Sequence, residues 1–65
     1  MDVEKAEGLL FRLGFSDFRV RAYEGAARIQ VQSGQMAQLL SHREEILSAL
    51  KPCFRGVFLD LEGRP

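Results

Sequence analysis

Cysteine is almost absent from this 65-residue sequence, with Cys53 as the single example. One thiol cannot form an internal disulfide, and no C-x-x-C pair or second thiol is available for a metal site. No apolar run approaches the roughly 18 residues that a membrane-spanning helix needs, and the start lacks the basic-then-apolar pattern of a signal peptide. These absences predict a protein of a reducing compartment, and we expect it in the cytoplasm.

An excess of either charge is also missing. Nine Lys and Arg residues balance nine Asp and Glu residues, so the formal net charge is zero at pH 7. A chain without net charge has no overall field to attract nucleic acid or an anionic membrane surface. We therefore expect neither as a partner, and any recognition by charge must come from a local cluster.

Patterns that carry catalysis or bind metals are missing as well. The sequence has no glycine-rich phosphate loop and no Ser-His-Asp set. His42 has no His, Cys or Asp at ligand spacing, so we expect it to cap a helix or face solvent. Cys53 follows Pro52 without a base nearby and is expected to be a small packed thiol. The chain by itself is predicted to hold no catalytic residue, metal or cofactor.

The residues that are present indicate one small folded domain spanning residues 1–65. An apolar fraction of 46% with 28% charged residues is normal for a globular protein and excludes an extended disordered tail. A chain of this length buries only about 60% of its unfolded surface, so its core must be thin.

Apolar periodicity predicts a helix followed by a hairpin. Residues 2–13 repeat apolar side chains at helical spacing, and Gly14 supplies a left-handed stop with Phe15 just beyond it. Residues 17–22 and 26–32 each alternate apolar and polar side chains, as half-buried strands do. The "YEG" between them is a short turn in which Gly25 can take a positive φ, so the two runs predict a β-hairpin.

The second half of the sequence predicts helical cover for this hairpin and a third strand. Residues 36–40 form a short apolar turn of helix, and Ser41 with Glu44 has the spacing of a capping box that opens a second segment ending at Pro52. The run 54–62 alternates again and is predicted to place Val57, Leu59 and Leu61 on one face.

This order is helix-strand-strand-helix-strand, an α+β arrangement with a three-stranded, mainly antiparallel sheet and helices on one face. The first strand is predicted to lie in the centre, with antiparallel neighbours on both sides. The arrangement is similar to a ferredoxin-like unit that lacks its first strand.

Three arginines are predicted to share the uncovered face of the sheet. Arg19, Arg21 and Arg28 fall opposite the apolar positions, and cross-strand neighbours lie about 5 Å apart. In one interpretation this is a solvated face whose arginines pair with Asp17, Asp60 and Glu62. In the other it is a phosphate or carboxylate site, or a surface that docks another domain.

An RNA-binding sheet is the weaker alternative for this face. Such a sheet stacks bases on aromatic side chains of its open face. The sequence offers only Phe58 for that role, with Tyr23 expected in the turn.

Two long stretches carry a family resemblance. "LGFSDFRVRAYEGAARIQV" and "REEILSALKPCFRGVFLDLEG" resemble the C-terminal domain of the LarE-like PP-loop ATPases, also described as ATP-dependent sacrificial sulfur transferases. Members of that family have an "LGF…VRVR" strand, an "ARIE" strand, an "R-E-E-I" helix and a closing "LDLEGYRSGS". The resemblance spans essentially the whole chain, and RVR, ARI and LDLEG occur in the family's order.

The resemblance implies that residues 1–65 are the C-terminal domain of a larger cytoplasmic enzyme. The N-terminal PP-loop ATPase domain of the parent would hold ATP and Mg²⁺ through an SGGxDS-type loop, adenylylate a carboxylate of a pyridinium dicarboxylate mononucleotide, and pass sulfur toward the nickel-pincer nucleotide cofactor. The C-terminal domain would border that site without catalysing the reaction, and it would contribute to a homo-oligomer.

The resemblance also implies site residues in this chain. Arg19 and Arg21 match the family's paired arginines and would contact a nucleotide-like anionic substrate, with Arg28 beside them. Glu7 matches a helix position where the family tends to carry a carboxylate that faces the site. Gln30, in contrast, stands where the family has the glutamate of "ARIE", which puts a metal or charge role of that carboxylate in doubt.

Other departures from the family pattern bear on the assignment. Cys53 replaces a usual glycine, and the chain continues after Gly63 with "RP" rather than "YRSGS". The shortened tail leaves a broader PP-loop ATPase open. The alternative from another class is a stand-alone α+β regulatory or protein-interaction module that self-associates through a sheet edge.

Overall fold

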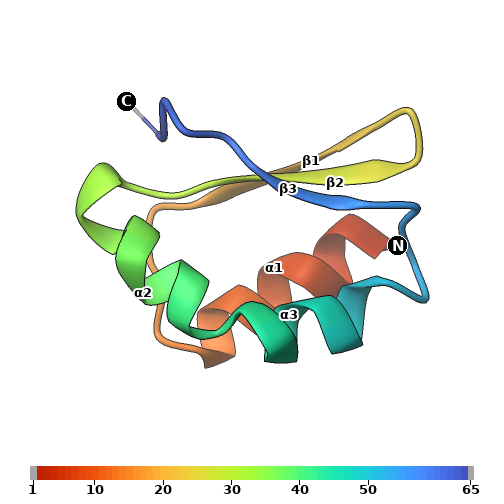
Figure 1. Cartoon of the computed structure of the whole chain (residues 1–65), viewed down its shortest axis with the longest axis horizontal. Helices are drawn as coiled ribbons and strands as arrows, with labels where there is room; N and C mark the ends of the chain where they lie inside the picture. The colour runs from red at the N-terminus through yellow and green to blue at the C-terminus, as the bar shows by residue number, and fades with distance from the viewer. Residues whose placement is uncertain (1, 65) are drawn as a thin grey trace.

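A computed structural model describes residues 2–64 and shows an α+β fold with three helices and a three-stranded sheet. Figure 1 shows all three helices on one side of the sheet, as the sequence predicts. The elements, in chain order, are α1 (Asp2–Arg12), β1 (Arg19–Tyr23), β2 (Ala26–Gln30), the 3₁₀ turn η1 (Ser33–Gln35), α2 (Met36–Ser41), α3 (Arg43–Leu50) and β3 (Val57–Leu59).

Helix α1 ends in the predicted glycine stop. Gly14 has a φ of 96°, a conformation that costs glycine little. The Phe15 N–H donates to the Leu10 carbonyl at 3.1 Å, and the Gly14 N–H donates to the Phe11 carbonyl at 3.1 Å. These two bonds are the Schellman pair that satisfies the last carbonyls of a helix. The chain is thereby turned from α1 back toward the sheet.

The hairpin is also present, with shifted bounds. β1 and β2 are antiparallel, and Tyr23 pairs with Ala26 across a two-residue turn in which Glu24 and Gly25 have φ values of 50° and 82°. Positive φ at both turn residues matches the type I′ geometry that suits the twist of a hairpin. β1 begins at Arg19 rather than residue 17, because Asp17 itself has a positive φ of 53°.

The predicted strand order is wrong. β2 lies in the centre, antiparallel to β1 and parallel to β3, whereas the sequence pattern suggested β1 in the centre with antiparallel neighbours only. The cause is the connection between β2 and β3, which contains α2 and α3. A helical crossover of this length returns the chain in its original direction, so β3 joins the sheet parallel to β2.

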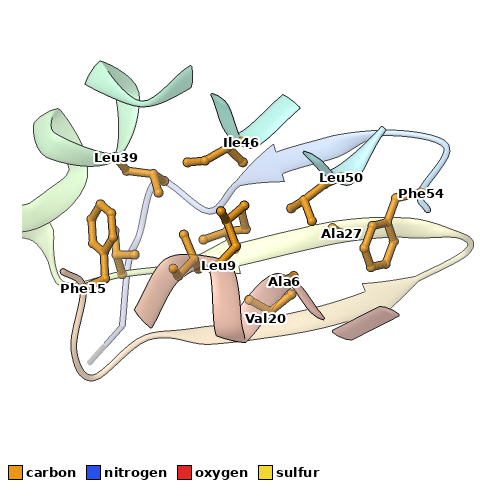
Figure 2. Packing of buried hydrophobic residues seen from close by; sticks show 12 residues of the cluster. Ala6, Leu9, Phe15, Val20, Ala27, Leu39, Ile46, Leu50 and Phe54 are labelled. Atoms are coloured by element: carbon orange, nitrogen blue, oxygen red, sulfur yellow. The ribbon is translucent and has the colours of Figure 1, made fainter. Parts of the chain in front are cut away.

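The core lies between the sheet and the helices, and no charged or polar side chain is buried among the described residues. Figure 2 shows Phe15 and Phe54 near opposite ends of the cluster, with Leu9 between them. Ala27 and Ile29 of β2 are almost fully buried on the helix side. The central strand therefore contributes its apolar face to the core and leaves Arg28 and Gln30 on the opposite face.

Three details on the helix side differ from the sequence interpretation. The Ser41 hydroxyl donates to the Gln38 carbonyl at 2.6 Å instead of capping α3, so the predicted capping box is absent. Leu40 is 59% exposed and lies at a groove beside β3 instead of in the core. Leu61 is 81% exposed, because β3 ends at Leu59 and the chain turns away.

Gly63 holds the C-terminal turn against η1 and α2. Its φ is 78°, and a Cβ there would lie 2.9 Å from both the Val31 carbonyl oxygen and the Met36 Cε. The next residue, Arg64, donates its N–H to the Val31 carbonyl at 2.9 Å. The final glycine of "LDLEG" is thus required by the backbone geometry and by the close approach of two other segments.

Gly63→Ala is expected to lower the free energy of unfolding by about 1–3 kcal/mol, because alanine adds both left-handed strain and a clash with backbone. Chemical denaturation of the two proteins measures the difference. Gly34→Ala is the matched control, since a Cβ at Gly34 meets nothing within 4 Å. An equal loss in both variants would contradict the role assigned to Gly63.

Candidate functional site: the arginine face of the sheet

The open face of the sheet brings together the three arginines predicted from the sequence. Arg19 and Arg21 lie on β1 and Arg28 on β2, and all three are exposed. The strand register pairs Arg21 directly with Arg28 and pairs Arg19 with Gln30. We call the surface formed by Arg19, Arg21 and Arg28 the arginine face.

This arrangement carries an electrostatic cost. Directly paired residues on one face of a sheet have Cβ atoms about 5 Å apart, and like charges at that separation repel. Within residues 2–64, none of the three guanidinium groups donates a hydrogen bond or forms an ion pair. The positive charge of the arginine face is therefore not neutralised by direct contacts inside the described chain.

Asp17 is the nearest carboxylate before β1, and its oxygens bind other groups. One oxygen accepts from the Arg64 Nε at 3.1 Å and the other from the Gln32 Nε2 at 2.8 Å. The hydrogen bond from Arg64, followed by the one from Gln32, holds the pKa of the Asp17 carboxyl below its usual value. Asp17 thus joins the β1 entry to the C-terminal turn instead of pairing with the arginine face.

Asp60 is engaged in a similar way just beyond β3. It accepts from the Gln30 Nε2 at 2.9 Å and from the Glu62 N–H at 3.0 Å. The Gln30 bond first, then the Glu62 bond, lowers the pKa of the Asp60 carboxyl, and the nearby charge of Arg28 adds a smaller contribution. No ion pair joins Asp60 to Arg28 in the described residues, so Arg28 acts on Asp60 only at longer range.

Gln30 has a clear structural role at the position where the LarE-like pattern has glutamate. Its neutral amide donates to the Asp60 carboxylate, whereas a glutamate there would place two carboxylates side by side, and these would repel each other.

The interpretation in which Arg19, Arg21 and Arg28 pair with Asp17, Asp60 and Glu62 is not what the structure shows. The carboxylates at 17 and 60 are held by Arg64, Gln32 and Gln30.

Two aromatic side chains and a fourth arginine extend the arginine face. Tyr23 is 68% exposed and Phe58 60% exposed. Tyr23 is the last residue of β1 rather than a turn residue, and its period-two spacing from Arg19 and Arg21 was the signal for its place on this face. A shallow hollow in the surface is lined by Tyr23, Glu24, Ala26, Arg28, Arg55, Gly56 and Phe58.

Arg55 was not predicted as part of this surface, because strict alternation along 54–62 would place it on the side of Val57 and Leu59, whereas it precedes β3 in the structure. Its guanidinium donates to the Glu24 carbonyl at 3.4 Å, and its own N–H donates to the Gly25 carbonyl at 2.9 Å. These bonds tie the start of β3 to the hairpin turn. Only the folded chain brings Arg55 beside Arg28.

The remaining candidate residues lie away from the arginine face. Glu7 is half-buried on α1, on the side of the sheet that the helices cover, so the structure does not bring it to the arginines. His42 lies 3.3 Å from the Glu45 carboxylate and packs edge-on against Phe15. Cys53 is half-buried beside the Lys5 amine, with 3.6 Å between sulfur and nitrogen.

No three His, Cys, Asp or Glu side chains in residues 2–64 lie together in a way that could hold a metal ion. None of the helices in this range is long and apolar enough to cross a membrane. No protein-family model matches the chain, and no curated protein matches it.

The lowered pKa values of Asp17 and Asp60 make the fold sensitive to acid. A carboxyl whose pKa is lower in the folded state stabilises the fold fully above its unfolded pKa, near 4, and loses that contribution as pH falls through the folded value. We expect the melting temperature to fall as the pH is lowered from 5 to 2, with a smaller fall in Asp17→Asn. Asparagine tolerates the positive φ at this position. Equal acid dependence in the two proteins would contradict the Asp17 assignment.

Proposed function

We propose that this chain is the non-catalytic, substrate-facing C-terminal domain of a PP-loop ATP-utilising enzyme that resembles the LarE-like sulfur transferases. One observation carries the proposal. Arg19, Arg21 and Arg28 lie together on an open sheet face while the carboxylates that could neutralise them bind other residues.

An anionic ligand is the partner that suits this chemistry. Guanidinium groups are always charged near neutral pH and present several N–H donors in a planar fork that matches phosphate and carboxylate oxygens. An anion against the face would relieve the repulsion between Arg21 and Arg28. The exposed rings of Tyr23 and Phe58 offer apolar contact beside the charge.

The arginine face can bind part of a ligand but cannot process it. It is open to solvent, no group of three metal-ligating side chains lies together among the described residues, and the Cys53 thiol beside the Lys5 amine lies away from this face. In the proposed parent, the N-terminal PP-loop ATPase domain holds ATP and Mg²⁺ and performs the chemistry. The present domain covers the anionic side of the bound substrate, in a cytoplasmic homo-oligomer.

The resemblance to the LarE-like family supplies the enzyme class in this proposal. The "RVR" arginines and the "ARI" arginine, which the sequence resemblance rests on, are the three on the arginine face. Gly63 of "LDLEG" shapes the turn that places Arg64 against Asp17. The family pattern therefore coincides partly with positions that shape the fold and partly with positions that face solvent.

NMR titration of the 65-residue chain with AMP, ATP and nicotinic acid mononucleotide tests the ligand part of the proposal. We expect saturable Nε shifts of Arg19, Arg21 and Arg28 with affinity no tighter than about millimolar, since exposed ion pairs in water are weak. Arg21→Gln should weaken binding several-fold. Arg12→Gln, which removes an exposed arginine from α1, should leave it unchanged. Absence of saturable shifts, or an equal effect of both substitutions, would contradict a ligand site on this face.

The coding sequence upstream separates this proposal from a stand-alone regulatory module. An open reading frame that runs into Asp2 and encodes an SGGxDS motif is expected if the domain belongs to a PP-loop enzyme. A translation start at Met1, found by mass spectrometry of the protein from its native cells, would refute a covalent PP-loop partner.

A further inference from the structure

We propose that two copies of this chain pair through the outer edge of β3, antiparallel, with the twofold axis passing beside Phe58. This interface is independent of the proposed enzyme class, because it follows from the backbone and surface of β3. We call the outer side of residues Val57–Leu59 the β3 edge.

The β3 edge presents unpaired backbone groups in a regular array. The Ala27 N–H donates to the Gly56 carbonyl and the Asp60 N–H donates to the Ile29 carbonyl, each at 2.9 Å. Backbone groups alternate in direction along a strand, so Gly56, Phe58 and Asp60 point toward β2. Val57 and Leu59 therefore each direct one N–H and one C=O away from the sheet, where no other strand of the described chain lies.

These four groups match their own copy in a symmetric pairing. If Phe58 faces Phe58 of the second copy, Val57 of each copy faces Leu59 of the other. Each of these two pairs then exchanges two N–H to O=C hydrogen bonds, as in a narrow antiparallel pair. The same patch serves on both sides, which is the requirement for a closed twofold dimer.

The surface beside the β3 edge is mainly apolar. Between Gly56 and Asp60 there is no charged residue and no proline, two of the features that protect a free edge, and the shortness of the three-residue strand is the protection that remains. An apolar groove runs between β3 and the helices α2 and α3, lined in part by Leu40, Leu47, Val57 and Leu59. Antiparallel pairing would cover this groove and bring the two Phe58 rings together on the open face.

The opposite edge of the sheet, formed by β1, is protected against the same contact. Its open-face side chains include Arg19 and Arg21, and neither has a counter-ion in the described chain. A symmetric β1 pairing centred on Arg21 would place two guanidinium groups directly opposite each other. Like charges in that position destabilise a strand pair, so self-association is directed to β3.

Charge at the two ends of β3 selects the antiparallel direction. Arg55 precedes the strand, whereas Asp60 and Glu62 follow it, so the segment is basic at its start and acidic at its end. An antiparallel pair centred on Phe58 places Gly56 opposite Asp60 of the second copy, so the basic start of each strand lies near the acidic end of the other. A parallel pair would instead set Arg55 beside Arg55 and Asp60 beside Asp60. Complementary charge across the edge favours the first arrangement.

The proposed dimer joins the two sheets into one of six strands. A twofold axis perpendicular to the sheet keeps both open faces on the same side, because it does not invert the layers. The arginine faces of the two copies would then form one continuous surface on either side of the paired Phe58 rings. The helices of both copies would cover the other side (Figure 1).

Sedimentation equilibrium of the 65-residue chain over a range of protein concentrations tests the association. We expect a monomer–dimer equilibrium, and Phe58→Lys should raise the dissociation constant at least tenfold, because it places two ammonium groups opposite each other at the axis. Tyr23→Lys is the matched control, since it adds the same charge at another exposed aromatic residue on the same face of the sheet, but on β1 instead of β3. It should change the dissociation constant less than twofold.

A cysteine placed at the axis tests the register. Opposite residues of a non-hydrogen-bonded antiparallel pair have Cα atoms about 4.5 Å apart, within the range a disulfide spans. Phe58→Cys in a Cys53→Ser background should therefore oxidise to a covalent dimer. This oxidation should be faster for the folded protein than for the same variant in denaturant, where only random collisions bring two thiols together. Tyr23→Cys in the same background should remain largely monomeric under the same oxidant.

Three different results would overturn the proposed dimer, and they do not all depend on the same variant. A wild-type chain that stays monomeric at millimolar concentration would overturn it, as would equal effects of Phe58→Lys and Tyr23→Lys. Equal disulfide yields from the two cysteine variants would also overturn it. Val57→Pro removes an outward N–H of an edge strand and also changes a side chain that packs against the core. Its circular dichroism spectrum is therefore checked first, and a folded Val57→Pro protein should show a weakened dimer.

Discussion

The structure depends on the two-sided character of the central strand β2. Ala27 and Ile29 face the helices and are almost fully buried, while Arg28 and Gln30 face the open side. Because β2 pairs with β1 on one side and β3 on the other, this alternation sets the side-chain direction of the whole sheet. A shift of one residue would bury arginine and expose isoleucine. The core and the arginine face are thus two consequences of one register.

The positions of the carboxylates determine whether the positive charge of the arginine face is neutralised within the chain. Asp17 precedes β1 and Asp60 follows β3, and each is bound to residues that come late in the chain or lie on a neighbouring strand. These bonds attach the C-terminal segment to the sheet and leave the guanidinium groups of Arg19 and Arg21 without a contact. Asp17 and Asp60 thus help to close the fold, and the arginine face remains open to an external anion.

Local sequence patterns predicted the local structure and failed where distant segments decide. The stop at Gly14 and the hairpin around Gly25 follow from a few adjacent residues, and both are present. The place of β3 depends on how α2 and α3 pack over β2, so the antiparallel prediction for β3 was wrong. The Gln30–Asp60 bond joins residues 30 positions apart and exists only because β3 runs parallel to β2. The three arginines could be placed on one face from alternation alone, but their lack of counter-ions could not.

The most direct test of this account is the pKa of Asp17, measured by NMR in wild type, in Arg64→Gln and in Arg19→Gln/Arg21→Gln. If the carboxylate is held by Arg64 and Gln32, the first variant raises its pKa toward the usual value and the double variant leaves it nearly unchanged. A clear rise in the double variant would show that Asp17 pairs with the arginine face in solution. The face would then be neutralised within the chain, and the proposed anion site would lose its basis.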